Sequence, residues 1–361
     1  MSTWDLLIGG YTDLLLESAA TASGPPAAVR WASLDDAGRL VDRGRLDCGT
    51  NPSWLTLHPE LPVAYACGED FAPGTTGSVT AWYLGGDTPT LLGTGSSGGH
   101  APCHALVVPD GDRQALVLSH YVGGQVSVVP LDFDGRPSAT ASDVVAHAGA
   151  SLVKPERQEA AHPHQAMFDP VGELVWVSDL GQDRVVAYRV RAGRLTEVGS
   201  LATAPGFGPR HAALHPQGDH LALVGELANE VVLYRRGATA TTWQQIDSSS
   251  TLPAGWPAAN TAAALVWSPR GDILYASNRG HDSVAVWRFD ASAGRLDLVG
   301  HSLVGGNPRD FSLTPDGDWA LCAAQDEDRA VVYRVRPDGL LSGEVGSLAC
   351  AGAARVAVHT S

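Results

Sequence analysis

Ionisable side chains recur in this chain at two kinds of position, directly before a short apolar run and directly after one. Some of them are arginines, whose guanidinium groups bind phosphate or carboxylate oxygens through two parallel hydrogen bonds. The others are histidines and carboxylates, which can act as general acids or bases. The full set comprises His104, His120, His162, His164, His211, Arg210, Arg279, Arg309, Glu69, Asp179 and Glu226. Brought together, these side chains would form a site for an anionic ligand with acid–base chemistry beside it.

An internal repeat explains how such residues could meet. An apolar stretch that ends in proline occurs six times, with the prolines at positions 59, 109, 170, 216, 269 and 315. A second run, such as Asp183–Tyr188 or Asp282–Trp287, starts at a turn residue and ends on an aromatic or apolar residue. Two further short runs complete each unit, and their composition is typical of β-strands bounded by turns. Four-stranded units that recur about every 40–50 residues predict the blades of a β-propeller.

The two chain ends predict how the ring closes. Segments 6–11, 28–33 and 39–43 are three strands that lack an inner partner, and segment 354–359 is a lone strand of the inner type. Together they complete a seventh blade, which removes two exposed sheet edges. We therefore expect an all-β, seven-bladed propeller of four-stranded antiparallel blades, with residues 1–361 as one domain. Segment 140–163, the longest between repeats, is expected to be an ordered loop.

In such a ring, the starts of the inner strands and the ends of the second strands lie at the same end of the central channel. Loops at the end of a rigid scaffold commonly carry function. The repeat therefore predicts that the histidines, arginines and carboxylates named above surround one mouth of the channel.

Charge and cysteine content exclude several classes of function. The chain has 361 residues and a formal net charge of −15, which disfavours nucleic acid and anionic membranes as partners. No apolar run approaches the ~18 residues of a transmembrane helix, and the start lacks the features of a secretory signal. The five cysteines contain no Cys-x-x-Cys pair. We expect reduced thiols and a cytoplasmic protein.

Short motifs run through nearly the whole chain in a recognisable order: Asn51–Leu55, Gly99–His104, Arg157–Gln165, Ser178–Arg184, Gly206–His211, Gly225–Leu227, Ser277–Ser283 and Asn307–Phe311. Together they resemble the seven-bladed propeller lactonase family, which includes the propeller type of 6-phosphogluconolactonase and the carboxy-muconate lactonising enzymes. The resemblance implies a catalytic set of His164, Arg210, Glu226 and Arg279. The chain departs from the family at Ala262–Ala264, where an acidic residue is frequent, and at Ser119–Tyr121, where Asn-Tyr is usual.

The resemblance implies hydrolysis of the lactone of an anionic sugar acid, with 6-phosphogluconolactone as the expected substrate. Water must attack the carbonyl, so the site needs a base and cations beside the oxyanion. Either Glu226 or His164 is expected to be the base, and arginines beside Glu226 would weaken it and favour His164. Arg210 and Arg279 are expected to stabilise the oxyanion. The expected substrate-binding residues are Glu69, His104, Arg157, His162, Asp179, His211, Arg309 and Gln325.

Several alternatives stay open at this point. Asp179 could cap a β-turn, and Arg157 with Glu159 could form a solvated surface pair. The pair His162 and His164 is a weak metal motif, so we expect neither a metal nor an organic cofactor. A cycloisomerase acting on a carboxylated substrate could use the same residues, and a propeller can also be a non-catalytic binding module. The expected state is a monomer or a small homo-oligomer.

Overall fold

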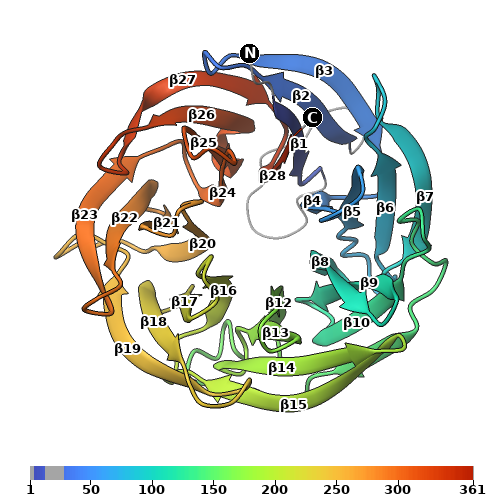
Figure 1. Ribbon diagram of the computed structural model, residues 1–361, viewed down its shortest axis with the longest axis horizontal. Helices are drawn as coiled ribbons and strands as arrows, with labels where there is room; N and C mark the ends of the chain where they lie inside the picture. The colour runs from blue at the N-terminus through green and yellow to red at the C-terminus, as the bar shows by residue number, and fades with distance from the viewer. Residues whose placement is uncertain (1–3, 13–27, 361) are drawn as a thin grey trace.

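Seven four-stranded antiparallel sheets surround a central axis in the computed structural model, which describes residues 4–12 and 28–360 (Figure 1). From the axis outward, blade 1 is β28 (Ala353–Thr360), β1 (Trp4–Gly10), β2 (Ala28–Leu34) and β3 (Leu40–Asp47); blade 2 is β4 (Pro52–Leu57), β5 (Val63–Gly68), β6 (Ser78–Tyr83) and β7 (Thr90–Ser96); blade 3 is β8 (Pro102–Asp110), β9 (Arg113–His120), β10 (Gln125–Pro130) and β11 (Asp143–Ala146). Blade 4 is β12 (Pro163–Asp169), β13 (Leu174–Asp179), β14 (Arg184–Arg191) and β15 (Arg194–Ala202); blade 5 is β16 (Pro209–Leu214), β17 (His220–Gly225), β18 (Glu230–Arg236) and β19 (Trp243–Ser250). Blade 6 is β20 (Thr261–Trp267), β21 (Ile273–Arg279), β22 (Ser283–Asp290) and β23 (Arg295–Leu303); blade 7 is β24 (Pro308–Leu313), β25 (Trp319–Ala324), β26 (Arg329–Val335) and β27 (Leu341–Ala349). The predicted all-β propeller with seven blades is confirmed.

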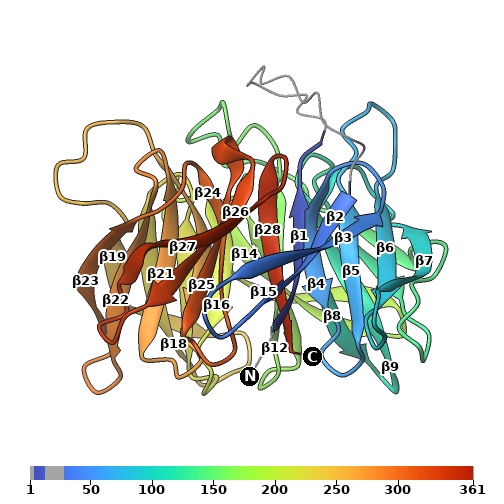
Figure 2. The same cartoon turned by 90° about the horizontal axis from the view of Figure 1, so that it is seen from above.

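The two ends of the chain close the ring as predicted. Strand β28 pairs antiparallel with β1, with Leu6 opposite Val358 and Ile8 opposite Val356. Neighbouring inner strands contact one another around the axis, including β28 with β4 and with β24. The N- and C-termini consequently lie on the same face of the ring (Figure 2).

Hydrophobic side chains fill each of the seven spaces between neighbouring blades. The aromatic residues that end the third strands are buried there, as the repeat predicts, and Trp176 of a second strand is also fully buried. Burying one large apolar side chain contributes about 1.5–3 kcal/mol. Because each interface joins two blades, the ring gains most of its cohesion only when all seven are present. The buried third-strand residues of this kind are Trp82, Tyr188, Tyr234, Trp287 and Tyr333.

The segment between blades 3 and 4 differs from the prediction of an ordered loop over 140–163. Residues Asp143–Ala146 form β11, which pairs with β10 and completes blade 3. The strand is only four residues long and is half-exposed, so its apolar pattern is weak. Residues 147–162 remain irregular and lead into β12.

Every inner strand begins with a shift in its pairing register. In most blades a proline opens the strand, and the residue before it has a positive φ at Asn51 (47°), Ala101 (49°), Gly208 (61°) and Asn307 (53°). Asparagine and glycine tolerate this left-handed conformation. A β-bulge turns one side chain away from the regular alternation of the strand. The Asn-Pro and Gly-Pro motifs thus mark the points where a side chain is turned at the channel mouth.

No helix of the described ranges is long and apolar enough to cross a membrane.

Replacing Ile8 with alanine should test ring closure. Ile8 is fully buried opposite Val356, so the change should lower the free energy of unfolding by about 2–5 kcal/mol. Urea denaturation followed by tryptophan fluorescence measures it. The control is Leu298→Ala on an outer strand, where the side chain is exposed and the expected change is within about 0.5 kcal/mol. Equal effects of the two changes would contradict the role of the β1–β28 seam.

Candidate active site

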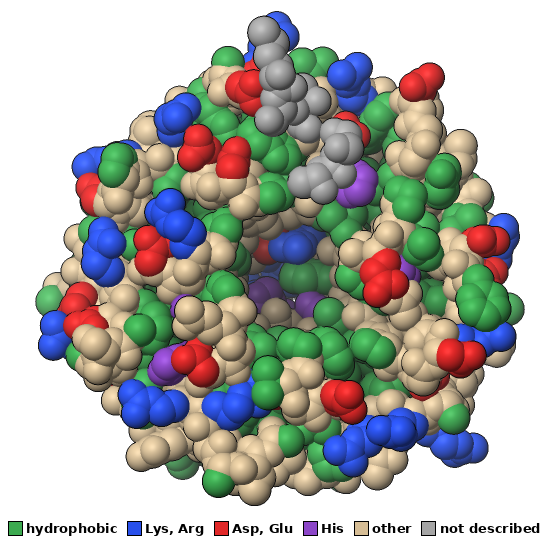
Figure 3. All heavy atoms as spheres, in the orientation of Figure 1, with side chains coloured by type: hydrophobic (Ala, Val, Ile, Leu, Met, Phe, Trp, Pro, Cys, Tyr) green, Lys and Arg blue, Asp and Glu red, His purple; other side chains and the backbone are tan. Residues whose placement is uncertain are grey.

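The bulges give each blade one residue at the start of its inner strand. Because these residues stand at equivalent positions around the axis, side chains from distant parts of the chain converge there. Viewed along the axis, the ring is hollowed at its centre, and basic and histidine side chains lie inside the hollow (Figure 3). The bulge residues are Ser53, Cys103, His164, Arg210, Arg309 and Ala354, and blade 6 has Ala263 and Ala264 at this place.

Glu226 is the centre of a buried charge cluster. It directly follows β17, and its backbone N–H donates to the carbonyl of Gly208 at 2.9 Å. Its Oε2 lies 2.9 Å from Arg210 Nε and 3.0 Å from Arg279 Nη2, and its Oε1 lies 2.5 Å from Arg157 Nη2. The Glu226 and Arg210 side chains are 4% and 3% exposed, whereas Arg157 is 36% exposed. Arg157 therefore closes the cluster on its solvent side.

One carboxylate against three guanidinium groups leaves an excess of positive charge. Burial alone would raise the pKa of Glu226, but Arg279, Arg210 and Arg157 together lower it to about 2. Burial and the neighbouring Arg279 lower the pKa of Arg210 to about 9, although Glu226 opposes this. A guanidinium group carries five N–H donors, so the arginines keep donors that Glu226 does not use. The arrangement suits an anion that completes the charge balance.

Three histidines lie beside this cluster in an electroneutral form. The rings of His164 and His211 are 5.4 Å apart, and those of His104 and His211 are 6.5 Å apart. Burial first, and then the Arg210 charge, holds the pKa of His164 and of His211 well below its usual range. For His104 the causes are burial, Arg355 and Arg210. Arg210 Nη1 donates to His211 Nε2 at 3.0 Å, which requires that nitrogen to be unprotonated.

His164 differs from its neighbours in one respect. Its Nδ1 atom is buried and has no hydrogen-bond partner. A buried polar atom without a partner costs about 1–3 kcal/mol unless a water or a ligand supplies one. The ring packs edge-on against Tyr121 at 5.7 Å, and the Tyr121 hydroxyl accepts a hydrogen bond from Arg157 at 3.2 Å. His164 thus presents a basic nitrogen beside the arginine cluster.

Glu69 occupies the other side of the mouth, after β5 of blade 2. The Tyr11 hydroxyl donates to Glu69 Oε2 at 2.8 Å and accepts from Arg309 Nη2 at 2.7 Å. Burial raises the pKa of Glu69, against the opposing effect of Arg309. Glu69 and Tyr11 are both buried, and Tyr11 is held by its backbone N–H on the carbonyl of Gly352 at 3.0 Å.

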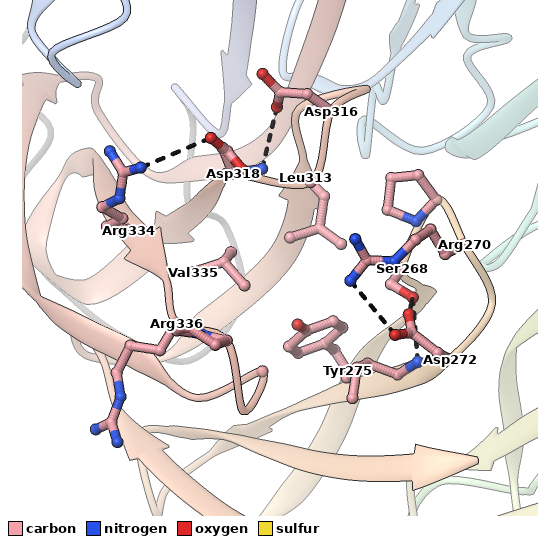
Figure 4. A pocket seen from close by; sticks show the side chains of 15 residues that line it. Ser268, Arg270, Asp272, Tyr275, Leu313, Asp316, Asp318, Arg334, Val335 and Arg336 are labelled. Carbon is pink, nitrogen blue, oxygen red and sulfur yellow. Dashed lines mark hydrogen bonds and ion pairs between the residues drawn. The ribbon is translucent and has the colours of Figure 1, made fainter. Parts of the chain in front are cut away.

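Two hollows away from this mouth carry different chemistry. Further along the channel, a cavity of about 610 Å³ is lined by residues from all seven inner strands, most of them apolar. Another, of about 430 Å³, lies between blades 6 and 7 (Figure 4). Its arginines face aspartates, with Arg270 3.4 Å from Asp272 and Arg334 3.7 Å from Asp318. Neither hollow combines free positive charge with basic nitrogens as the mouth does.

Within residues 4–12 and 28–360, no group of three or more His, Cys, Asp or Glu side chains is arranged to hold a metal ion. The five cysteines are free thiols, and all except Cys48 are buried.

Comparison with known proteins identifies the family. The family profile described as "Lactonase, 7-bladed beta-propeller" matches residues 5–358. The chain belongs to this lactonase family. It is accordingly an enzyme of the lactonase class, which opens cyclic esters by hydrolysis.

Two relatives and one solved structure illustrate the likeness. The chain is 32% identical to a 6-phosphogluconolactonase of Bacillus subtilis over 286 residues, 78% of this chain and 80% of the relative. It is 27% identical to a 6-phosphogluconolactonase of Formosa agariphila over 305 residues, 80% and 82% of the two chains. A periplasmic gluconolactonase of Pseudomonas aeruginosa matches over 99% of both chains, with 26% identity and a TM-score of 0.87. These matches do not favour the cycloisomerase or binding-module alternatives, and the cytoplasmic location stays a prediction.

The structure gathers most of the lactonase site residues expected from the sequence. His164, Arg210, Glu226 and Arg279, the expected catalytic set, lie together with Arg157 and His211, and with His104 next to His211. Glu69 and Arg309 form the second group through Tyr11. Their roles in the reaction remain proposals.

Three expected binding residues lie outside these two groups. Asp179 is fully buried, and its carboxylate binds His147 Nδ1 at 2.6 Å and the His162 and Gln182 backbone N–H groups. Such bonds are those of a structural cap. His162 stacks on Tyr121 at 4.4 Å, with its Nδ1 2.8 Å from the Tyr121 carbonyl and its Nε2 3.0 Å from Glu159. Gln325 is half-buried at the start of the 3-10 helix η1 (Gln325–Glu327).

Sequence reasoning missed Tyr11 and Lys154. Tyr11 follows β1 as Glu69 follows β5, so the rule about strand ends could have found it. Lys154 Nζ donates to the carbonyl of Leu227 at 2.5 Å, which fastens the loop that carries Arg157 to the turn that carries Glu226. Gln158 anchors the same loop by donating to Asp183 at 2.8 Å. No local motif marks Lys154, because its partner is 73 residues away.

Glu226→Gln should reveal how strongly the arginines depend on their carboxylate. Leaving three guanidinium groups without it should lower the free energy of unfolding by about 3–5 kcal/mol at pH 7. Because folding depresses the pKa of Glu226 from 4.5 to about 2, its contribution is complete above pH 4.5 and is lost as the pH falls toward 2. The difference between wild type and variant should therefore shrink over that interval in denaturation experiments.

The matched control is Glu344→Gln on the outer strand β27. Glu344 forms a 2.6 Å pair with Arg329, and both side chains are accessible to solvent. An exposed pair of this kind contributes at most about 1 kcal/mol. A Glu226→Gln variant as stable as this control would show that the cluster does not depend on Glu226.

Proposed function

We propose that this lactonase hydrolyses the lactone of a phosphorylated sugar acid, with 6-phosphogluconolactone as the substrate. The observation that carries this proposal is the excess of buried arginine charge at the channel mouth. Arg157, Arg210, Arg279 and Arg309 meet only two carboxyl groups, Glu226 and Glu69. A phosphate has two negative charges and several acceptor oxygens, so it complements such a site. The names of the two 6-phosphogluconolactonase relatives support the same substrate.

The proposed reaction begins with attack of water on the lactone carbonyl carbon. His164 takes the proton of that water at Nδ1, since this atom has no partner within the protein. His164 is unprotonated at neutral pH, because burial and the arginines hold its pKa well below its usual range. Those charges also weaken it as a base, but an anionic substrate on the arginines offsets part of their effect. Base strength thus rises when substrate binds.

Glu226 serves this scheme as a positioning residue. A carboxylate with a pKa near 2 is a poor proton acceptor, so it is not assigned as the base. It instead fixes Arg210 and Arg279, whose remaining N–H groups stabilise the oxyanion as the carbonyl bond breaks. Preorganised donors of this type commonly accelerate the reaction by about 10²–10³-fold each. Arg309, His104 and His211 would extend the binding shell.

A coupled assay tests the proposal directly. Freshly generated 6-phosphogluconolactone is supplied, and the released 6-phosphogluconate is followed through its dehydrogenase above the spontaneous rate. We expect clear acceleration by the wild type and a loss of about 10²-fold or more in kcat for His164→Asn and for Arg279→Ala. Glu344→Gln serves as the unchanged control. Wild-type protein that hydrolyses neither phosphorylated nor plain sugar lactones would refute the proposed function.

Arg157 should report which part of the substrate carries the charge. It is the most exposed arginine of the cluster, so we place it against the phosphate rather than the reacting carbonyl. Arg157→Ala should raise KM for 6-phosphogluconolactone by about 10- to 100-fold, and leave KM for unphosphorylated gluconolactone nearly unchanged. Steady-state kinetics with both lactones gives the ratio. A similar loss for both would place Arg157 in the structure of the mouth instead.

A further inference from the structure

Two carboxyl groups face the channel mouth from opposite blades and have opposite electrostatic surroundings. Glu226 of blade 5 contacts three guanidinium groups directly. Glu69 of blade 2 has no direct ion pair among the described residues, because the Tyr11 hydroxyl stands between it and Arg309. Its backbone is fixed by Asn51, whose carbonyl accepts from Glu69 N–H at 3.0 Å and whose Nδ2 donates to the Glu69 carbonyl at 3.1 Å. Two carboxyls whose surroundings separate them in this way can divide acid and base duties between them.

We propose that Glu69 is a further catalytic residue of the lactonase, the general acid that protonates the ring oxygen as the lactone opens. This inference rests on the proposed function, because it concerns the leaving group of the same hydrolysis. It assigns to Glu69 a proton, whereas a binding role would need only its charge or its hydrogen bonds.

The step balances as follows. Water has added to the carbonyl carbon and His164 Nδ1 holds its proton, so the tetrahedral intermediate is an oxyanion stabilised by arginines. The oxyanion re-forms the carbonyl, and the bond between that carbon and the ring oxygen breaks with its electron pair on the ring oxygen. Glu69 transfers its carboxyl proton to that oxygen, which becomes the product hydroxyl. Glu69 is left as a carboxylate near Arg309, and the His164 proton passes to solvent or returns to Glu69.

The contacts of Glu69 fit a proton donor. Tyr11 donates to Oε2, so Oε1 is the oxygen that can carry the proton. The charged or titratable groups that face it are Tyr11, Arg309, Arg210 and the Cys67 and Cys103 thiols, with the Ser53 hydroxyl beside them. Burial raises the pKa of both thiols and of Tyr11, so all three stay neutral. Burial also raises the pKa of Glu69, although the arginines oppose it.

The same surroundings set an order of protonation. Glu69 must hold its proton, and His164 must not, in the active form. Because burial moves the pKa of Glu69 up and that of His164 down, both conditions are met over a shared range of pH. Activity should fall below this range as His164 is protonated, and above it as Glu69 loses its proton.

The test compares wild type with Glu69→Gln, which keeps the size of the side chain but has no proton to transfer. With 6-phosphogluconolactone, kcat should fall by about 10²-fold or more, and the descending limb of the pH profile at high pH should vanish. The corresponding thiolactone, with sulfur in place of the ring oxygen, releases a thiolate that needs little protonation. Its hydrolysis by Glu69→Gln should fall by less than about 3-fold.

Matched variants separate chemistry from structure. Tyr11→Phe removes the hydroxyl that holds Oε2, and should shift the descending limb without abolishing it. Glu197→Gln, on the exposed face of the outer strand β15, should behave as wild type. Thermal unfolding of each variant shows whether it is folded.

Two results would overturn the assignment. A folded Glu69→Gln variant that hydrolyses 6-phosphogluconolactone at the wild-type rate, or that retains the descending limb, shows that Glu69 gives no proton. Equal losses on lactone and thiolactone assign it to binding or packing. If wild type turns over the lactone but not the thiolactone, the pH profile alone decides. Failure of wild type on the lactone itself refutes the proposed function and is thus distinguishable.

Discussion

Antiparallel pairing of β1 with β28 is the constraint on which the rest of this molecule depends. It joins residues more than 340 positions apart and supplies blade 1 with its inner strand. The same seam places Tyr11, whose backbone N–H is held by Gly352, next to Glu69 and Arg309. Closure is therefore both the condition for a ring without sheet edges and the means by which blade 1 contributes to the site.

The mouth of the channel concentrates interactions that do not favour folding. Arg210 is almost fully buried, and the Nδ1 atom of His164 lacks a partner. Buried cations and unsatisfied polar atoms are costly, so the apolar interfaces between blades must offset them. Such local strain is common where a site is arranged for its ligand rather than for the empty protein. The ring provides this rigidity because each inner strand is held by its own blade and by both neighbours.

Most of the fold and part of the site could be predicted from the sequence. The repeat of turn, proline and strand led directly to the blade count, since each signal is local. The bulge residues His164, Arg210 and Arg309 could be predicted because they occupy the same place in the repeat. Asp179 could not be separated from them by type or position, because its hydrogen bonds to His147 and to backbone groups appear only in three dimensions.

Long-range contacts account for the other differences. Strand β11 is short and half-exposed, and its pairing with β10 depends on a partner strand rather than on its own pattern. Arg157 lies on a loop whose course is set by Lys154 and Gln158, which bind carbonyl and carboxylate oxygens of other blades' turns. Sequence spacing carries no record of such contacts. The opposite electrostatic states of Glu69 and Glu226 were likewise beyond reach, since both are glutamates that follow a buried strand.

The alanines among the bulge residues have a consequence for how this enzyme can evolve. Ala354 in blade 1, and Ala263 and Ala264 in blade 6, occupy the place that His164 and the arginines occupy elsewhere. Each bulge residue is held by the ladder of its own blade, so a replacement there leaves the neighbouring blades in register. A new functional group can be introduced at one alanine while the arginines continue to bind an anion. The ring thus separates substrate preference from scaffold stability and offers directed evolution positions that can be varied independently.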